Sequence, residues 1–368
     1  MTVTSRVPPG LERRVLRTLL GLPAAWAVWL AGAAARAAVA NRADGTADVD
    51  DGLLDPSLQL IFALQRRRGV YGSSAGTAEA TRRLIRHNVA LAAGVPTPVG
   101  RVHHLRVPGA DGMLRARHYA PLPAGGGPQP LLVYLHGGGF VAGDLDTHDE
   151  PCRLLCRHAG VHVLAVEYRL APEFPFPAGV DDAYAATQWA LAHAGDLDAD
   201  PARVAVGGDS AGANLAAVAC LLARRRDAPA PAAQLLLYPP TDYHGPWRSR
   251  TVFADSPMLT GEDIEFFHAQ YSAGEDPDDE RHSPLRAADL SGLPPAMVVT
   301  AALDPLRDEG EAYAEALRGA GNRVVAWRVP GLVHGFANLT TVSRTAHDSV
   351  VEIAGALRAL LASAEVAS

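Results

Sequence analysis

The sequence predicts an α/β fold, with a mostly parallel central sheet covered by helices on both faces. Short continuous apolar runs alternate with helical segments, a pattern typical of strands that are buried on both faces. An alternating pattern ahead of them, broken by a turn at 109–112, predicts an antiparallel hairpin at one sheet edge. The hairpin covers 101–107 and 114–119; the apolar runs are 131–135, 161–166, 203–206, 235–238, 297–300 and 324–329; the helical segments are 147–159, 180–193, 213–225, 307–320 and 345–362.

Two regions interrupt this regular alternation. Residues 53–64 and 77–93 carry apolar residues at helical spacing, the second with Arg82, Arg83 and Arg86 on its polar side. The connection between residues 238 and 297 is far longer than usual, and it contains an aromatic-rich helical segment at 263–271. We expect both regions to form a cap; from periodicity alone, the N-terminal helices could equally be a helical extension without that role. The division expected is a helical cap segment at 1–97 and a catalytic domain at 98–368, with a cap insertion at about 240–282.

Residues 11–40 have three interpretations. Three arginines precede an apolar stretch at 19–30, and small residues at 38–40 resemble a cleavage site, as in a signal peptide. Gly21 and Pro23 interrupt that stretch, which is also at the lower limit for crossing a bilayer. The favoured interpretation is an apolar helix that covers a pocket of the same chain. A cytoplasmic protein is therefore expected, with export or membrane association through 11–40 as the alternatives.

Composition excludes several other classes of protein. Apolar residues make up 48% of the chain and charged residues 20%, which is typical of a globular protein. With 33 basic and 40 acidic residues, the net charge of −7 offers no electrostatic footprint for nucleic acid. Cys152, Cys156 and Cys220 are too few and too unevenly spaced for a disulfide framework. We expect them to pack in the core, without a metal site.

A serine stands between glycines where an apolar run becomes a helix. The pattern Gly208-x-Ser210-x-Gly212 follows the run 204–206 and leads into an alanine-rich segment, which predicts strand, sharp turn and helix with Ser210 at the apex. Taken alone, the pattern also fits a glycine-rich helix start. A serine nucleophile needs a base to remove its proton and an acid to orient that base. Both should lie at the carboxyl ends of later strands.

Two later strand ends carry suitable side chains. Asp304 follows the apolar run ending at Leu303, and His334 follows the run at 324–329. The chain order serine, aspartate, histidine is that of one large class of serine hydrolases. Asp308 and Glu309 stand at the start of the next helix, where the helix dipole favours carboxylates, so we predict a capping role for them. This chemistry requires no metal and no organic cofactor.

A run of glycines after the first long apolar strand suits a developing negative charge. In His136-Gly137-Gly138-Gly139, unhindered amides can turn towards a neighbouring loop. We predict an oxyanion hole made by the amides of Gly137, Gly138 and Ala211, and a structural role for His136 in holding the loop. As a phosphate cradle the run is inferior, because the P-loop lysine and spacing are absent.

Five ordered motifs resemble the hormone-sensitive lipase family of α/β-hydrolases, with the bacterial carboxylesterase branch fitting best. The resemblance covers about residues 50–365. It implies a nucleophile at Ser210, an acid at Asp304, a base at His334, oxyanion donors at Gly137, Gly138 and Ala211, and a cap from the N-terminal helices and the insertion. One departure is Ala213, where the family commonly has glycine. The motifs are His136-Gly137-Gly138-Gly139, Tyr168-Arg169-Leu170-Ala171-Pro172-Glu173, Gly208-Asp209-Ser210-Ala211-Gly212, Asp304-Pro305-Leu306-Arg307-Asp308-Glu309-Gly310 and His334-Gly335-Phe336.

These observations predict a serine carboxylesterase that forms an acyl-enzyme from short- to medium-chain acyl esters. A lipase, or a hydrolase of amides, lactones or carbamates, would use the same triad. A non-catalytic small-ligand receptor is disfavoured because all three triad residues are present. The edge strand after Val324 would also suit a homodimer. The aromatic residues available to an apolar cap are Trp26, Trp29, Phe266, Phe267 and Tyr271.

Overall fold

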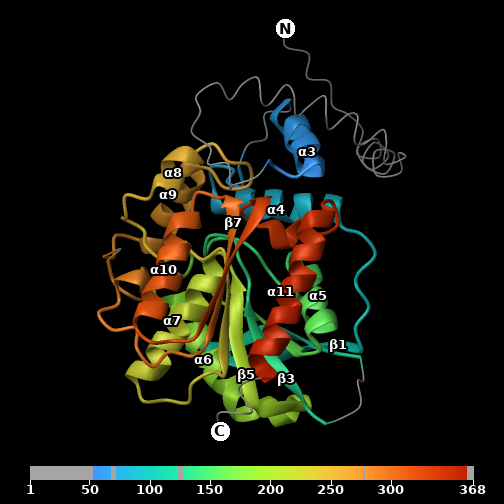
Figure 1. Ribbon diagram of the computed structural model, residues 1–368, viewed down its shortest axis with the longest axis vertical. Helices are drawn as coiled ribbons and strands as arrows, with labels where there is room; N and C mark the ends of the chain where they lie inside the picture. Colours follow the sequence, from blue (N-terminus) through green and yellow to red (C-terminus); the bar gives the residue numbers. More distant parts are fainter. Residues whose placement is uncertain (1–52, 68–71, 123–126, 277, 363–368) are drawn as a thin grey trace.

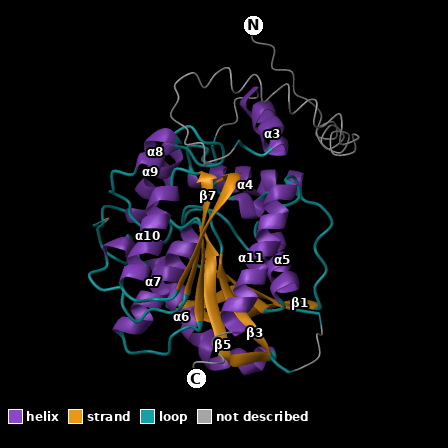
Figure 2. Ribbon diagram, viewed as in Figure 1, coloured by secondary structure: helices purple, strands orange, loops and turns teal. Residues whose placement is uncertain are grey.

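A mixed eight-stranded sheet forms the centre of the molecule (Figure 1, Figure 2). The computed structural model describes residues 53–67, 72–122, 127–276 and 278–362. The first two strands form the predicted antiparallel edge hairpin, β2 also pairs antiparallel with β4, and the other pairs are parallel. In spatial order the strands are β1 (Arg101–Gly109), β2 (Gly112–Ala120), β4 (His162–Glu167), β3 (Gln129–Leu135), β5 (Ala199–Asp209), β6 (Ala233–Leu237), β7 (Ala296–Leu303) and β8 (Val324–Val333).

Helices cover both faces of the sheet, as predicted. Along β3, Leu131 and Val133 pack into one core layer and Leu132 and Tyr134 into the other, because successive strand residues point to opposite faces. Fully burying each such leucine stabilises the fold by about 1.5–3 kcal/mol. The first layer is covered by α6 (Ala178–His193), α7 (Ala211–Arg225) and α10 (Arg307–Gly319), and the second by α5 (Asp149–Ala159) and α11 (Arg344–Ala362).

The parallel strands bring distant residues to one edge of the sheet. Strand β5 ends immediately before Ser210, β7 before Asp304 and β8 before His334. Strand β3 lies between β4 and β5 and ends at Leu135, immediately before the glycine loop. Because parallel strands share a direction, all four loops meet at the same edge.

Among the residues that the structure describes, four further helices surround this edge. The helices α3 (Pro56–Arg67) and α4 (Ala78–Ala92) precede the sheet in the chain and lie over its end, near the tip of β7 in Figure 1. The helices α8 (Arg248–Val252) and α9 (Gly261–Ser272) belong to the long connection between β6 and β7. Thr260 and Asp263 form a capping box at the start of α9, which explains why that helix begins there.

The polar side of α4 contacts the domain that contains the sheet. The guanidinium of Arg82 donates to the Val141 carbonyl at 2.7 Å and pairs with Glu173, and Arg86 pairs with Asp144 at 2.6 Å. These contacts hold α4 in a fixed orientation, so its apolar side faces the cavity described below.

Three further sequence predictions concern the cysteines, membrane-spanning helices and the segment 11–40. The three cysteines are buried and unbonded to one another. In the part of the chain that the structure describes, no helix is both long and apolar enough to cross a membrane. The segment 11–40, with Trp26 and Trp29, lies outside the described residues.

Candidate active site

Ser210 occupies a strained turn between β5 and α7. Its backbone has φ 52° and ψ −122°, a conformation that ordinary side chains rarely adopt. The flanking glycines are required by close packing: a Cβ at Gly208 would lie 2.2 Å from the Leu135 carbonyl oxygen, and one at Gly212 would lie 1.9 Å from it. The sequence pattern therefore reflects a tight strand–helix crossing, and the serine hydroxyl projects from its apex.

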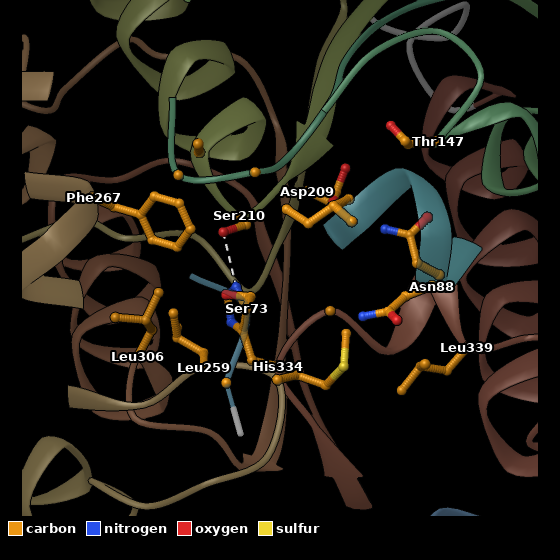
Figure 3. A pocket seen from close by; sticks show the side chains of 18 of the residues that line it. Ser73, Asn88, Thr147, Asp209, Ser210, Leu259, Phe267, Leu306, His334 and Leu339 are labelled. Atoms are coloured by element: carbon orange, nitrogen blue, oxygen red, sulfur yellow. Dashed lines mark hydrogen bonds between the residues drawn. The ribbon is translucent and has the colours of Figure 1, made fainter. Parts of the chain in front are cut away.

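The three predicted strand-end residues come together. His334 Nε2 lies 2.8 Å from Ser210 Oγ, the contact drawn as a dashed line in Figure 3. On the other side of the ring, His334 Nδ1 lies 2.8 Å from Asp304 Oδ2. Asp304 is completely buried, and its second oxygen accepts the Leu306 amide at 2.8 Å. In this arrangement an imidazole can accept the serine proton while the carboxylate fixes its tautomer.

The glycine loop corrects one predicted residue. The Gly137 amide donates to Asp209 Oδ1 at 2.9 Å and is therefore already engaged, so its prediction as an oxyanion donor was wrong. Gly138 and Gly139 line the cavity beside Ser210 and Ala211, and both have positive φ, 118° and 62°. No hydrogen bond to the amides of Gly138, Gly139 or Ala211 is found among the described residues. These three amides are the ones free to face a substrate oxygen.

A buried carboxylate directly before Ser210 holds this loop, and sequence reasoning missed it. Asp209 Oδ1 accepts from Tyr134 Oη at 2.8 Å and from the Gly137 amide, and it lies 3.4 Å from His148 Nε2. Burial opposes the charge on Asp209, but His148 and these donors outweigh it and lower the pKa of the carboxyl group. The same carboxylate, against the cost of burial, raises the pKa of His148. The available signal was its position directly before Ser210.

His136 contacts the glycine loop, as expected for its predicted structural role. Its Nδ1 lies 2.9 Å from the Gly137 carbonyl, and its own carbonyl accepts from Tyr168 Oη at 2.7 Å. Burial lowers the pKa of His136 to about 4, so the ring is neutral at physiological pH.

The acidic pair after Asp304 does not cap α10 with its side chains. Glu309 is fully buried, accepts the Thr241 amide at 2.9 Å and pairs with Arg250 at 2.8 Å. Asp308 accepts the Ser249 amide at 2.8 Å. The capping prediction was wrong because the insertion between β6 and β7 folds back onto these carboxylates and uses them as anchors.

A cavity of about 680 Å³ opens onto Ser210. Residues of α3, α4, α9 and the catalytic loops line it, and Phe267, Leu259 and Leu306 lie near the serine in Figure 3. Asp263 accepts the amides of Ser73 and Ser74 at 3.1 and 2.8 Å, which ties the α3–α4 connection to α9. Of the predicted aromatic residues, Phe267 and Tyr271 line the cavity and Phe266 does not. The methyl group of Ala213 is buried in the core and does not narrow the pocket.

Comparison with known proteins agrees with this geometry. A family profile described as alpha/beta hydrolase fold matches residues 132–338, more than half of the chain. The chain is 46% identical to carboxylic ester hydrolase LipN of Mycobacterium tuberculosis over 95% of its own length and 93% of the relative's. It is 38% identical to ethyl acetate hydrolase of Pseudomonas putida over 82% of its own length and 96% of the relative's.

A solved ester hydrolase from the metagenome of Lake Arreo, complexed with a bipyridine phosphonate derivative, superposes with a TM-score of 0.80 and 38% identity. The match covers 83% of this chain and 99% of that structure. These similarities cover most of the chain and are not confined to the motifs around the site. The chain therefore belongs to the hormone-sensitive lipase group of the α/β-hydrolase family and is a carboxylic ester hydrolase.

Proposed function

We propose that Ser210, His334 and Asp304 hydrolyse the ester as a catalytic triad. The observation that carries the proposal is the pair of 2.8 Å contacts that joins the three side chains in line. His334 Nε2 takes the proton from Ser210 Oγ as that oxygen attacks the ester carbonyl carbon, and Asp304 stabilises the imidazolium that forms.

The carbonyl oxygen becomes an oxyanion during the attack. The amides of Gly138, Gly139 and Ala211 supply the donors, held in place before the reaction by the loop contacts described above. The tetrahedral intermediate collapses when His334 protonates the departing alcohol, which leaves an acyl group on Ser210 Oγ. Water, deprotonated by the same imidazole, then attacks the acyl-enzyme and releases the acid.

Short- to medium-chain acyl esters fit this site best. We infer that the segment 1–97 and an insertion at about 240–282 form a cap. In support, described residues of α3, α4 and α9 line a cavity of about 680 Å³ beside the serine. That volume is within the usual range for small-ligand pockets, whereas a triglyceride needs a more open approach. One relative, the ethyl acetate hydrolase, is named for a very short ester.

Replacement of the nucleophile tests the triad. We expect Ser210→Ala to lower kcat on 4-nitrophenyl butyrate by about 10⁴-fold or more and to abolish labelling by a fluorophosphonate probe. Ser73→Ala is the matched control, since Ser73 lies beside the triad in Figure 3 and takes no part in the proposed reaction. A Ser210→Ala protein with the original rate would refute the triad.

Acyl-chain profiling tests the substrate class. Rates on 4-nitrophenyl esters from acetate to palmitate should peak between two and eight carbons, because the capped cavity limits the length of the acyl group. A maximum at palmitate would overturn this assignment.

We also propose a cytoplasmic protein that forms a homodimer through the free edge of β8, where Val325 is 41% exposed. Light scattering should give twice the chain mass, and Val325→Arg should give a single chain mass.

Fractionation of cells that express the chain with and without residues 1–40 tests the location, since membrane association through that segment would place only the full chain in the membrane fraction.

A further inference from the structure

His148 is a buried histidine that the proposed mechanism does not use. It is the N-cap residue of α5, lines the cavity and is only 5% exposed. Its Nε2 lies 3.4 Å from Oδ1 of Asp209, the residue directly before Ser210. In the view of Figure 3, Asp209 lies between Ser210 and Thr147, the neighbour of His148 in the chain. The charge on this ring therefore acts on the carboxylate that holds the Gly137 amide.

The contact at Nδ1 of His148 requires a proton on that nitrogen. Nδ1 lies 2.9 Å from Thr147 Oγ1. The same hydroxyl donates to the Asp144 carbonyl at 2.9 Å and accepts from the Asp144 amide at 2.8 Å. A hydroxyl has one hydrogen and two lone pairs, so what remains for His148 is a lone pair. His148 Nδ1 is therefore the donor in this contact.

The contact at Nε2 requires a second proton on the same ring. Asp209 Oδ1 accepts from Tyr134 Oη and from the Gly137 amide, and both donors stabilise the ionised carboxylate. A lone pair on Nε2 would be repelled by that oxygen, whereas an N–H is attracted to it. The tautomer protonated on Nε2 alone would instead take the Thr147 hydroxyl proton from the Asp144 carbonyl. Only the doubly protonated ring satisfies all of these contacts.

The side-chain amide of Asn338 fits either charge state of the ring. Its Nδ2 lies 3.2 Å from His148 Nε2, and its Oδ1 is buried without a partner in the described part of the chain. A half-turn of the amide exchanges these two atoms and breaks no other hydrogen bond of this side chain there. With Oδ1 towards the ring the amide accepts from an Nε2 proton, and with Nδ2 towards the ring it donates to a bare Nε2.

The charges around the ring favour the imidazolium. Burial opposes a charge on His148, but the carboxylates of Asp209 and Asp144 outweigh it and raise the pKa of the ring. The dipole of α5 also opposes a cation at the N-cap, and the two carboxylates in its first turn oppose that effect. The titratable or charged groups next to the ring or its partners are Asp209 on β5, Asp144 with its partner Arg86 of α4, Tyr134 on β3, His136 with its ring centroid 5.4 Å away, and Asp149 and Glu150 on α5.

We propose that His148 is a positioning residue that acts as an imidazolium, paired with Asp209 and with the amide oxygen of Asn338 turned towards it. In this state the carboxylate stays on the Gly137 amide, and the glycine loop keeps its direction. Loss of the Nε2 proton to the solvent places a lone pair against the carboxylate and loosens its hold on Gly137, so activity falls at alkaline pH. This role of His148 rests on the proposed function, because it assumes that the loop stabilises the oxyanion of a reaction at Ser210.

The pH dependence of kcat tests the role of His148. Hydrolysis of ethyl butyrate is followed by pH-stat titration from about pH 6 to about pH 10.5, at the values where the near-UV circular dichroism equals that at pH 7. The kcat of the wild-type protein should fall about tenfold along an alkaline limb while KM changes little, because the oxyanion donors act on the transition state. A kcat that stays level over this range would overturn the proposal.

Two variants connect the alkaline limb to this ring. His148→Gln removes the titrating group but keeps an N–H donor for Asp209, so its kcat should show no alkaline limb; a limb like that of the wild type would contradict the proposal.

Asn338→Asp gives a second measurement if His148→Gln folds poorly. A carboxylate next to the ring favours the imidazolium, so the limb should move to higher pH by about one unit or more. A purely structural Asn338 would leave the limb where it is. His193→Gln, at an exposed histidine of α6, is the matched control and should keep the wild-type profile.

Nuclear magnetic resonance reports the proton without any assay of activity. In protein with ¹⁵N-labelled histidine, a two-bond ¹H–¹⁵N spectrum at pH 7 distinguishes an imidazolium from a neutral ring, and the signal missing from His148→Gln belongs to His148. We expect an imidazolium, and a neutral His148 would refute the proposal. Ser210→Ala should give the same His148 signal. Activity retained by Ser210→Ala would therefore refute the triad alone, and a neutral ring in an active enzyme would refute only the role of His148.

Discussion

Asp209→Ala should reduce both stability and catalytic rate, although Asp209 has no role in the proposed chemical steps. The carboxylate accepts from Tyr134 Oη and from the Gly137 amide, and both donors are buried. Each buried donor left without a partner costs about 1–3 kcal/mol, so the free energy of unfolding should fall by about 2–6 kcal/mol. Urea unfolding at pH 7 measures this loss.

The effect on rate follows from the position of Gly137 in the glycine loop. Without the Asp209 contact, the following amides of Gly138 and Gly139 lose their fixed direction towards the oxyanion. Loss of one oxyanion donor costs about 10²–10³-fold in kcat, and we expect a reduction of about that size with KM changed little, since the donors act on the transition state. Rates on 4-nitrophenyl butyrate give kcat and KM separately.

Asp209→Asn is the matched variant. Its amide oxygen can still accept from Tyr134 and Gly137, but the charge facing His148 is lost, so it should recover most of the stability and much of kcat. An Asp209→Ala protein with kcat within twofold of wild type would show that the carboxylate does not position the oxyanion loop. Equal losses in both variants would show that the charge, and not the acceptor geometry, is what matters.

Three further predictions test the loop, the cap and the pH dependence. Gly139→Ala should lower kcat at least tenfold, because φ is 62° and a Cβ would lie 2.3 Å from the Phe267 ring. Adding Phe267→Ala removes the collision but not the backbone strain, so kcat should recover only in part. Full recovery of kcat would refute a contribution from backbone strain. Asp263→Ala removes the acceptor of the Ser73 amide, so amide hydrogen exchange at 72–76 should become faster and KM should rise. Unchanged exchange would mean that other contacts hold the segment 72–76. Burial lowers the pKa of His118 from 6.5 to about 3, so the unfolded chain binds one more proton between these values. The stability contribution is complete above pH 6.5 and falls as the pH drops towards 3, with about 3 kcal/mol lost by pH 4.5. His118→Gln should flatten the pH dependence of urea unfolding by about one proton, and an unaltered slope would exclude His118 as its source.

Residues that depend on local pattern were predictable. The order of strands and helices follows from alternating apolar runs, and Ser210, Asp304 and His334 each follow a strand of the parallel part of the sheet, so that sheet had to bring them to one edge. The capping box of α9 is likewise readable within four consecutive residues.

Residues whose role depends on a distant partner were not predictable. Glu309 stands at a helix start, where local rules indicate capping, but a segment some 60 residues earlier supplies its partners Thr241 and Arg250. The partners of Asn214, the carbonyls of Pro240 and His282, likewise reach it only once the insertion has folded against α7.

The sequence by itself determined the sheet and the glycine loop beside it, and it singled out Ser210, His334 and Asp304 as the proposed nucleophile, base and acid, because each is encoded in a short run of residues. Only the tertiary structure decided which glycine amides remain free. Three consecutive glycines are equivalent in sequence, but the Asp209 carboxylate, 72 positions away along the chain, accepts the amide of Gly137. The amides of Gly138 and Gly139, two residues that line the cavity, have no acceptor among the described residues. A hydrogen bond engages one donor at a time, so the choice among identical residues depends on which neighbour packing places beside each of them.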